Sequence, residues 1–258
     1  MTENNEVVLI GAGNVATHLG LALKRAGFSI RQVYSRTEDS AQKLSSLLHA
    51  QPIVDIKDLN PDAENYFFSL TDSALPEILP KMPDSSGIFL HTSGSIPLEI
   101  FSPYHSRSGV FYPLQTFSKN KEIDFKKIPV FIEANNEQDL QFIEKLASKL
   151  SNTVVPLSSE KRKQLHLAAV FACNFVNHLY DKASQIVEKE GILREFLLPL
   201  IEETADKVKI LHPSDAQTGP AVRFDKEIIE KHLDLLKENP QDQEIYRLLS
   251  NSIFASKR

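Results

Sequence analysis

The stretch Val7-Val8-Leu9-Ile10-Gly11-Ala12-Gly13-Asn14-Val15-Ala16 decides the fold of this chain. Its first four residues predict a buried strand, and the two glycines predict a tight turn into a helix that begins at about Asn14. Gly11 permits the turn, Gly13 lets a pyrophosphate approach the backbone, and Ala16 lets the helix pack closely on the strand. The first backbone N–H groups of that helix face the place where phosphates would bind. The pattern indicates dinucleotide binding, and the alternative is an ordinary strand, turn and helix.

The composition of the 258 residues limits the classes of partner. The net charge is −5 and basic residues are scattered among acidic ones, so we expect neither nucleic-acid nor membrane binding. The first six residues are polar, and no apolar stretch is long enough to span a membrane. The only cysteine, Cys173, lies in an apolar helical run and cannot form an internal disulfide. These features predict a cytoplasmic protein with a small-molecule substrate, in which Cys173 belongs to the core.

Short β-rich runs alternate with helical patterns over residues 1–157. The alternation predicts a Rossmann-like α/β domain, with a mostly parallel sheet covered by helices on both faces. The runs expected as strands are 7–10, 29–34, 52–55, 66–70, 88–91, 110–112, 129–133 and 153–157.

Beyond residue 157 the strand signals end, which predicts an all-α domain over residues 158–258. The expected helices are 160–189, 193–211, 226–237 and 243–255. The middle of the first helix, Leu167 to Tyr180, is apolar on nearly every side. Such a helix is covered by neighbouring helices or by a partner chain, and a small domain offers few neighbours. We therefore expect a homodimer formed through Leu167 to Tyr180.

The triplet Ser35-Arg36-Thr37 follows the second expected strand, where an Asp or Glu would bind the ribose 2′-hydroxyl of NAD. A guanidinium can instead pair with a 2′-phosphate, to which hydroxyl groups can also donate. The triplet therefore favours NADP over NAD. The alternative is a solvated arginine in a loop, with Glu38 and Asp39 close by in the sequence.

Other candidate residues stand at the carboxyl ends of expected strands, where open parallel sheets bind ligands. They are Thr71, Asp72, His91, Ser93 and Gly94. Thr71 and Ser93 could donate to the phosphate, ribose or carboxamide groups of the cofactor. His91 could titrate near neutrality and donate a proton. Asp72 has a structural alternative, because it could cap the helix expected near Ser73.

The long helix carries His166, Asn174 and Asn177, which an α-helical wheel places within about a quarter turn of one another. A polar stripe on an apolar helix either satisfies its own hydrogen bonds or faces a substrate in a cleft between the domains. We expect His166 to act as acid or base and the two asparagines to orient the substrate. His178 lies off this stripe.

Segment 218–225 contains a Gly-Pro turn and ends in Asp225, which is placed to cap the next helix. Arg223 has no such structural role, so Arg223 and Thr218 are candidates to bind an anionic group of the substrate. The alternative for Arg223 is a surface ion pair with Asp225 or Glu227. We expect no metal site.

Six motifs spread over nearly the whole chain resemble a known family. They are GAGNVA at 11–16, VYSRT at 33–37, FLHTSGS at 89–95, GVFYPLQTF at 109–117, LHLAAVFACNFVNHL at 165–179 and TGPAVRFD at 218–225. They resemble two-domain proteins that join a Rossmann-like domain to a C-terminal helical domain of unknown function. The resemblance implies an NADP oxidoreductase. It extends more distantly to pyrroline-5-carboxylate reductase, prephenate dehydrogenase and the 6-phosphogluconate dehydrogenase superfamily.

Two departures from these distant relatives bear on the chemistry. In the resemblance to prephenate dehydrogenases, Tyr112-Pro113 occupies the position at which those enzymes carry His-Pro. Val170 stands where the β-hydroxyacid dehydrogenases would have their catalytic lysine if Asn174 matched their asparagine. The resemblance therefore implies neither of these two mechanisms for this chain.

The sequence as a whole predicts an NADP(H)-dependent oxidoreductase that acts on a small anionic metabolite in the cleft between its domains. The nicotinamide would exchange hydride, and His166 or His91 would supply the proton. Two alternatives stay open. One is a non-catalytic NADP-sensing protein that binds a partner, and the other is a reductase that uses a deazaflavin, coenzyme F420, as hydride partner.

Overall fold

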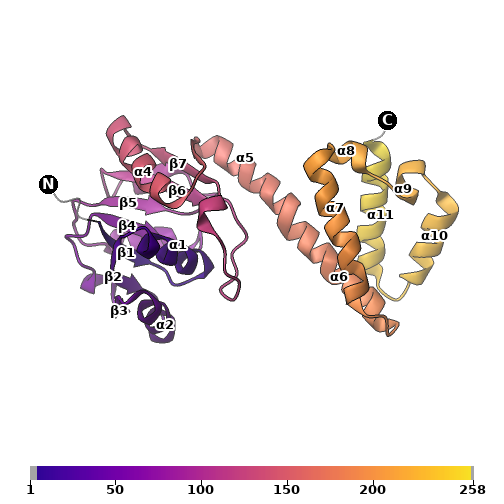
Figure 1. Cartoon of the computed structure of the whole chain (residues 1–258), viewed down its shortest axis with the longest axis horizontal. Helices are drawn as coiled ribbons and strands as arrows, with labels where there is room; N and C mark the ends of the chain where they lie inside the picture. The colour runs from indigo at the N-terminus through magenta and orange to yellow at the C-terminus, as the bar shows by residue number, and fades with distance from the viewer. Residues whose placement is uncertain (1–4, 257–258) are drawn as a thin grey trace. The chain divides into compact units, whose positions relative to one another are not determined.

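The computed structural model describes residues 5–256 of the chain (Figure 1). Contacts within the chain divide it into two compact units, one up to Asn174 and one from Phe175 onward. The last strand ends at Pro156, close to the point where the sequence loses its strand signals. The predicted domain boundary at residue 157 stays a prediction, because the two compact units meet in the sequence within the long helix.

An eight-stranded sheet forms the centre of the first unit, in the order β3-β2-β1-β4-β5-β6-β7-β8. The strands are β1 (Glu6–Ile10), β2 (Ser29–Tyr34), β3 (Gln51–Ile53), β4 (Asn65–Phe68), β5 (Ile88–His91), β6 (Ser108–Pro113), β7 (Val130–Ala134) and β8 (Val154–Pro156). All neighbouring strands are parallel except β6 and β7, which are antiparallel. The prediction of a mostly parallel sheet is confirmed. Its order from β3 to β6 is that of dinucleotide-binding folds.

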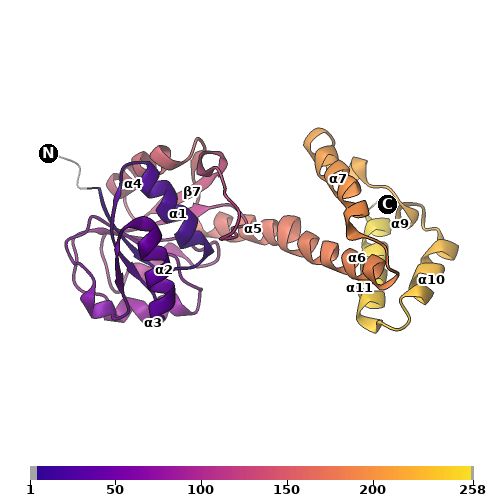
Figure 2. The same cartoon turned by 60° about the horizontal axis from the view of Figure 1, so that its bottom comes forward.

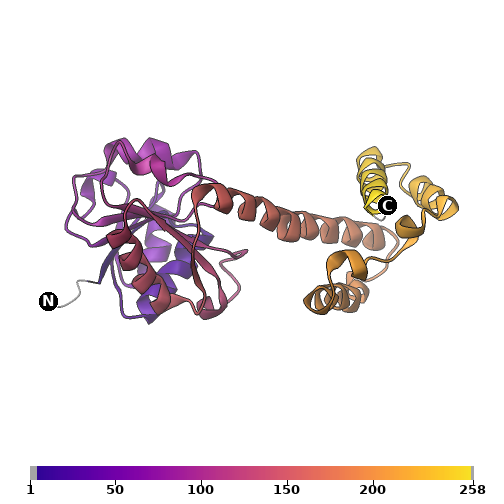
Figure 3. The same ribbon diagram turned by 90° about the horizontal axis from the view of Figure 1, so that it is seen from above.

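Helices cover both faces of this sheet, as Figure 3 shows. They are α1 (Asn14–Arg25), α2 (Glu38–Leu48), α3 (Ala74–Ile78) and α4 (Glu137–Leu150), with short 3₁₀ turns η1 (Ile56–Asp58), η2 (Leu79–Lys81), η3 (Leu98–Phe101) and η4 (Phe125–Lys127). Alternate side chains of β1 point to opposite faces. Val7 and Leu9 pack against apolar residues of α1, α2 and α4, whereas Val8 and Ile10 pack against those of α3 and η3. The two-layer covering leaves the carboxyl ends of the strands as the edge where a ligand can bind.

The long helix predicted over 160–189 is present, but its middle is not an α-helix. It consists of α5 (Ser159–Ala169), a π-helical segment η5 (Val170–Phe175) and α6 (Val176–Lys189). It ends before Gly191, whose φ of +70° stops regular helix. A π-helix turns less per residue than an α-helix, so side chains after η5 do not lie where an α-helical wheel places them.

Short and long helices make up the second unit, as predicted for an all-α region. After α6 come η6 (Arg194–Leu197), α7 (Leu198–Ile210), α8 (Pro213–Ala216), α9 (Pro220–Arg223), α10 (Lys226–Leu235) and α11 (Pro240–Ala255). Figure 2 shows α9, α10 and α11 grouped together. An ion pair of 3.0 Å between Lys182 and Asp242 joins α6 to α11. The one-turn helices α8 and α9 lie between the helices expected at 193–211 and 226–237.

Within the part of the chain that the structure describes, no helix has the length and apolar character needed to cross a membrane.

Candidate active site

Gly11 closes the turn after β1 in a way that only glycine allows. Its φ is +115°, and an added Cβ would lie 2.3 Å from the carbonyl oxygen of Ser69. The N–H of Gly11 donates to the carbonyl of Tyr34 at 2.9 Å. The turn is therefore held between the ends of β2 and β4, where a positive φ and a close approach both require glycine.

Gly13 and the start of α1 form an open cradle. Gly13 is the N-cap residue, and an added Cβ would meet no atom within 4 Å. Among the described side chains, none caps this end of α1, and its first turn contains no acidic residue. Ala16 is fully buried and lets α1 pack on the sheet, as expected. Open space beside uncapped N–H groups fits the pyrophosphate of a dinucleotide.

The triplet Ser35-Arg36-Thr37 follows β2 at the same edge of the sheet. Arg36 and Thr37 are exposed, and the N–H of Ser35 donates to the carbonyl of Ile53 at 3.2 Å. Thr37 is the N-cap of α2, but its side chain makes no capping hydrogen bond. Asp39 accepts from Lys43 at 2.7 Å, which offsets part of the negative charge near Arg36. The guanidinium and the Thr37 hydroxyl are thus placed in solvent beside the sheet edge.

The polar residues that follow β4 and β5 form hydrogen bonds mainly within their own two segments. The hydroxyl of Ser93 donates to the carboxylate of Asp72 at 2.8 Å and accepts from the N–H groups of Ser95 and Ile96 at 3.0 and 3.1 Å. Thr71 lies 3.3 Å from the hydroxyl of Ser73, measured between oxygens. Asp72 does not cap α3, whose N-cap residue is Ser73. The roles of Thr71, Asp72, Ser93 and Gly94 in binding a cofactor stay predictions.

His91 differs from the proton donor that its position in the sequence suggested. It is fully buried at the end of β5, beneath the Phe101 ring, and its Nδ1 accepts from the N–H of Ser93 at 3.2 Å. Burial, reinforced by the nearby guanidinium of Arg162, lowers the pKa of His91 to about 3. The imidazole is therefore neutral near pH 7, and because Nδ1 accepts a hydrogen bond, its one ring proton lies on the buried Nε2. The role of His91 as proton donor stays a prediction.

Tyr112 and His166 form a hydrogen-bonded pair that the sequence did not reveal. The phenol oxygen at the end of β6 lies 3.0 Å from Nδ1 of His166 on α5. Burial raises the pKa of Tyr112, and the Arg162 guanidinium opposes that rise. Because the phenol and Nδ1 share one proton, Nε2 is the ring nitrogen left for another partner. Gly94 touches this ring, since a Cβ there would lie 2.6 Å from it.

A buried ion pair fixes α5 against the segment that follows β5. Arg162 is fully buried, and its guanidinium donates to the carboxylate of Glu133 and to the carbonyl of Ile96. The hydroxyl of Ser159 donates to the same carboxylate at 2.7 Å. Arg162 stands one turn before His166 on α5. The network therefore holds the segment containing Gly94 close to the His166 ring.

A cavity of about 530 Å³ lies beside the Tyr112–His166 pair, within the first unit. It is lined by Tyr112, Leu114, Gln115, Thr116, Leu165, His166, Ala168, Ala169, Ala172, Cys173 and Asn174. The lining is mainly apolar, with a few polar groups among the apolar ones, as in small-molecule sites. Cys173 is exposed on this lining, so its predicted place in the core is wrong.

The remaining candidates belong to the second unit. Asn177 is exposed on α6, and η5 intervenes between it and His166, so the α-helical wheel does not apply to the predicted stripe. Arg223 is exposed at the end of α9, and Thr218 is exposed just before it. Asp225 caps α10, accepting from the N–H of Ile228 at 3.4 Å. The substrate-binding roles of Asn177, Thr218 and Arg223 stay predictions.

Residues 5–256 contain no group of three or more His, Cys, Asp or Glu side chains arranged to hold a metal ion.

Family comparisons match both parts of the chain. Residues 2–115 match the Rossmann-like domain family, and residues 128–253 match a domain of unknown function, DUF2520. No curated protein matches the chain.

Several solved structures resemble the whole chain. A "putative NADP oxidoreductase" from Bacteroides fragilis is 48% identical, with 97% of this chain and 98% of that chain covered and a TM-score of 0.92. A protein from Thermotoga maritima is 24% identical, with 94% and 97% covered and a TM-score of 0.77. A reductive aminase from Aspergillus terreus, in complex with NADPH and ethyl-5-oxohexanoate, is 18% identical, with 97% and 93% covered and a TM-score of 0.72. The last two likenesses concern the fold alone.

Proposed function

The chain belongs to the family that joins a Rossmann-like domain to DUF2520, and from this premise we propose that it is an NADP(H)-dependent oxidoreductase of a small anionic metabolite. The Bacteroides fragilis protein, which is 48% identical along almost the whole chain, is described as a "putative NADP oxidoreductase". The observation that carries the proposal is the Tyr112–His166 pair, which lines a cavity and touches the turn after β5.

The residues at the sheet edge fit an NADP cofactor. Gly11 and Gly13 with the start of α1 would hold the pyrophosphate, through backbone N–H groups and the positive end of the helix dipole. Arg36 would pair with the 2′-phosphate, helped by the hydroxyl groups of Ser35 and Thr37. The nicotinamide supplies or accepts the hydride.

His166 is the proton donor in the direction of reduction. Its Nδ1 is engaged by the phenol of Tyr112, so the proton that reaches the substrate leaves from Nε2. Tyr112 fixes the ring orientation and can return a proton to Nδ1, because the two groups are already within hydrogen-bond distance. Buried Arg162 and Glu133 keep the segment around Gly94 against the ring. A reaction that adds hydride to a carbonyl or imine carbon also needs one proton for the neighbouring heteroatom.

The substrate would be bound by polar groups close to His166. Asn174 lines the same cavity and can donate to a carbonyl or carboxylate oxygen. We propose that Asn177, Thr218 and Arg223 complete the site as predicted, with Arg223 as the anchor of the anionic group. The location of the substrate in a cleft between the domains stays a prediction.

A histidine held by a phenol at the end of a cavity favours an enzyme over a nucleotide sensor. A sensor needs a cofactor site but no proton donor, whereas His166 has both a positioned partner and a space beside it. None of the contacts described above favours a deazaflavin as the hydride partner.

We also propose that the protein is a homodimer through Leu167 to Tyr180. Leu167, Phe171 and Phe175 are about half exposed or more, at 52%, 62% and 49%. Side chains of this size along one helix are apolar surface that a second copy would cover.

The proposal is tested by replacing His166 in an assay that follows NADPH absorbance over a panel of small anionic carbonyl and imine metabolites. His166→Ala should lower turnover of the substrate so found by about 10²- to 10⁴-fold, because a general acid contributes that much. Asn174→Ala should also lower turnover, and the Kd of NADPH should stay unchanged in both variants.

The matched control is His212→Ala, an exposed histidine that lies outside the cavity lining and outside Leu167 to Tyr180. Its turnover should equal that of the unmodified protein. Unchanged turnover in His166→Ala would rule out this histidine as the proton donor.

A further inference from the structure

A segment between β6 and η4 packs along the glycine turn and α1. This segment, residues 114–124, is called the strap here. The side-chain amide of Asn14 donates to the carbonyl of Phe117 at 2.9 Å, and Nε2 of His18 lies 2.9 Å from the carbonyl oxygen of Ser118. The ammonium of Lys119 donates to the carbonyl of Ala12 at 2.9 Å. Three consecutive strap residues are thus tied to the cofactor-binding motif.

Packing supports these hydrogen bonds. His18 is buried, and its ring stacks on Phe117 with centroids 5.3 Å apart and planes at 28°. Phe117 in turn stacks on Phe125, the first residue of η4, at 6.3 Å. The backbone of the strap is therefore held at Phe117 and Ser118 independently of the Lys119 side chain.

The ammonium of Lys119 lies at the glycine turn. It is bound to the carbonyl of Ala12, the residue between the two glycines of the turn. The next residue, Gly13, is the N-cap of α1 and has open space where a Cβ would be. An ammonium has three protons, and the bond to Ala12 uses one of them. A cation with two remaining donors therefore stands within about one peptide unit of the phosphate cradle.

We propose that Lys119 binds the pyrophosphate of the dinucleotide, so that the strap supplies a cation that the glycine motif itself lacks. The proposal rests on the proposed function, because it takes a dinucleotide as the ligand of this turn. The first turn of α1 has no charged side chain of its own on the phosphate side, and Arg36 is placed at the end of β2 for a different phosphate. The ammonium of Lys119 would offset part of the charge of a group that carries two negative oxygens.

Removing a contact to the pyrophosphate and removing a contact to the 2′-phosphate should change the cofactor affinities in different ways. The pyrophosphate is common to NAD(H) and NADP(H), so loss of Lys119 should weaken both cofactors by the same factor. Loss of Arg36 should weaken the binding of NADP(H) alone.

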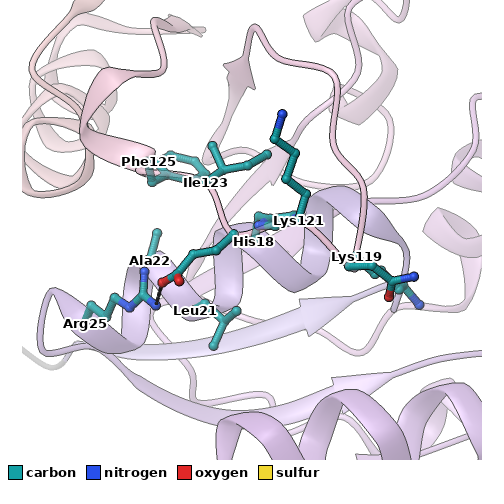
Figure 4. A pocket seen from close by; sticks show the side chains of 10 residues that line it. His18, Leu21, Ala22, Arg25, Lys119, Lys121, Ile123 and Phe125 are labelled. Carbon is teal, nitrogen blue, oxygen red and sulfur yellow. Dashed lines mark hydrogen bonds and ion pairs between the residues drawn. The ribbon is translucent and has the colours of Figure 1, made fainter. Parts of the chain in front are cut away.

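Lys121 is a matched control for Lys119, because Figure 4 shows the two side chains leaving the strap in different directions. Both line a cavity of about 240 Å³ beside α1, but only Lys119 is bonded to Ala12.

The experiment measures the Kd of NADPH and of NADH by titration calorimetry for the full chain and for Lys119→Met, Lys119→Arg and Lys121→Met. Lys119→Met should weaken both cofactors about tenfold, the effect of one hydrogen bond to a charged group. Lys119→Arg should keep most of the affinity, and Lys121→Met should match the unmodified protein. Adenosine 2′-monophosphate, which has no pyrophosphate, should bind Lys119→Met and the unmodified chain equally.

Three results would overturn the proposal. Unchanged affinities in Lys119→Met would make its bond to Ala12 purely structural. A loss for NADPH but not for NADH would place Lys119 at the 2′-phosphate. An unmodified chain that binds neither dinucleotide would contradict the proposed function itself. A melting temperature of Lys119→Met equal to that of the unmodified chain excludes misfolding as the cause of any loss of affinity.

Discussion

The sheet of the first unit and the helices of the second differ in how well the chain covers them. Residues Val7 to Ile10 of β1 have no exposed surface, and two helical layers close over them. No residue of α6 or α7 is buried within the described chain. Leu193, Phe196 and Ile210 are 61%, 70% and 83% exposed. The first unit completes its own core, whereas the second leaves large apolar side chains in solvent.

This difference separates two tasks within one chain. A closed core gives the first unit a rigid edge, on which the glycine turn, Arg36 and the Tyr112–His166 pair keep fixed positions. Exposed apolar helices are more typical of a surface that another chain covers. This comparison is the reason why we propose cofactor binding for the first unit and assembly through Leu167 to Tyr180.

The largest effect is expected on assembly. Leu167→Asp combined with Phe175→Asp places two charges on the proposed interface, where burying an unpaired carboxylate costs several kcal/mol. Light scattering at micromolar concentration should show a dimer for the unmodified chain and a monomer for the double variant. Leu235→Asp changes an 80% exposed leucine outside Leu167 to Tyr180 and should leave the dimer intact. A monomeric unmodified chain would end the dimer proposal.

A second effect follows from the closed core and concerns acid stability. His91 is protonated in the unfolded chain below about pH 6.5, but in the folded chain only near pH 3. The unfolded state therefore binds more protons between these values, and the stability conferred by neutral His91 is lost as the pH falls through that window. The slope is at most about 1.4 kcal/mol per pH unit for one proton.

Urea unfolding at several pH values between 7 and 4 measures this slope. His91→Gln removes the titrating group, so the free energy of unfolding should depend less steeply on pH in the variant. The same slope in both proteins would show that burial of His91 does not control the acid sensitivity of the first unit.

Local patterns were sufficient to predict most of the fold. The run 29–34 is β2 and the run 88–91 is β5, because β-rich segments bounded by turn residues pack only as strands here. The long helix was predicted within a residue of its observed ends. The π-helical η5 was not, since its backbone hydrogen bonds leave no periodic signal in an apolar run. The antiparallel pairing of β6 and β7 was not predicted either, because it is a contact between two strands and leaves no local pattern in the sequence.

The candidate site was harder to predict because it depends on contacts between distant residues. Tyr112 and His166 are 54 positions apart, and only the packing of α5 against β6 brings them together. The position of Tyr112 at the carboxyl end of an expected strand is the signal of this site that the sequence offers. His91 stands at such an end too, but the flanking strands β4 and β6 and the Phe101 ring bury it. Contacts that a single sequence does not display distinguish these two side chains, since Tyr112 lines the cavity and His91 does not.

The central claim is that the first unit binds NADP(H) and recognises its 2′-phosphate through Arg36. Titration of NADPH and NADH into the full chain and into Arg36→Ala tests it most directly. The account predicts that the unmodified chain binds NADPH more tightly than NADH, and that Arg36→Ala weakens NADPH by about 1.5–3 kcal/mol, the value of a hydrogen bond to a charged group, with NADH nearly unchanged. Equal losses for the two cofactors, or no preference in the unmodified chain, would contradict it.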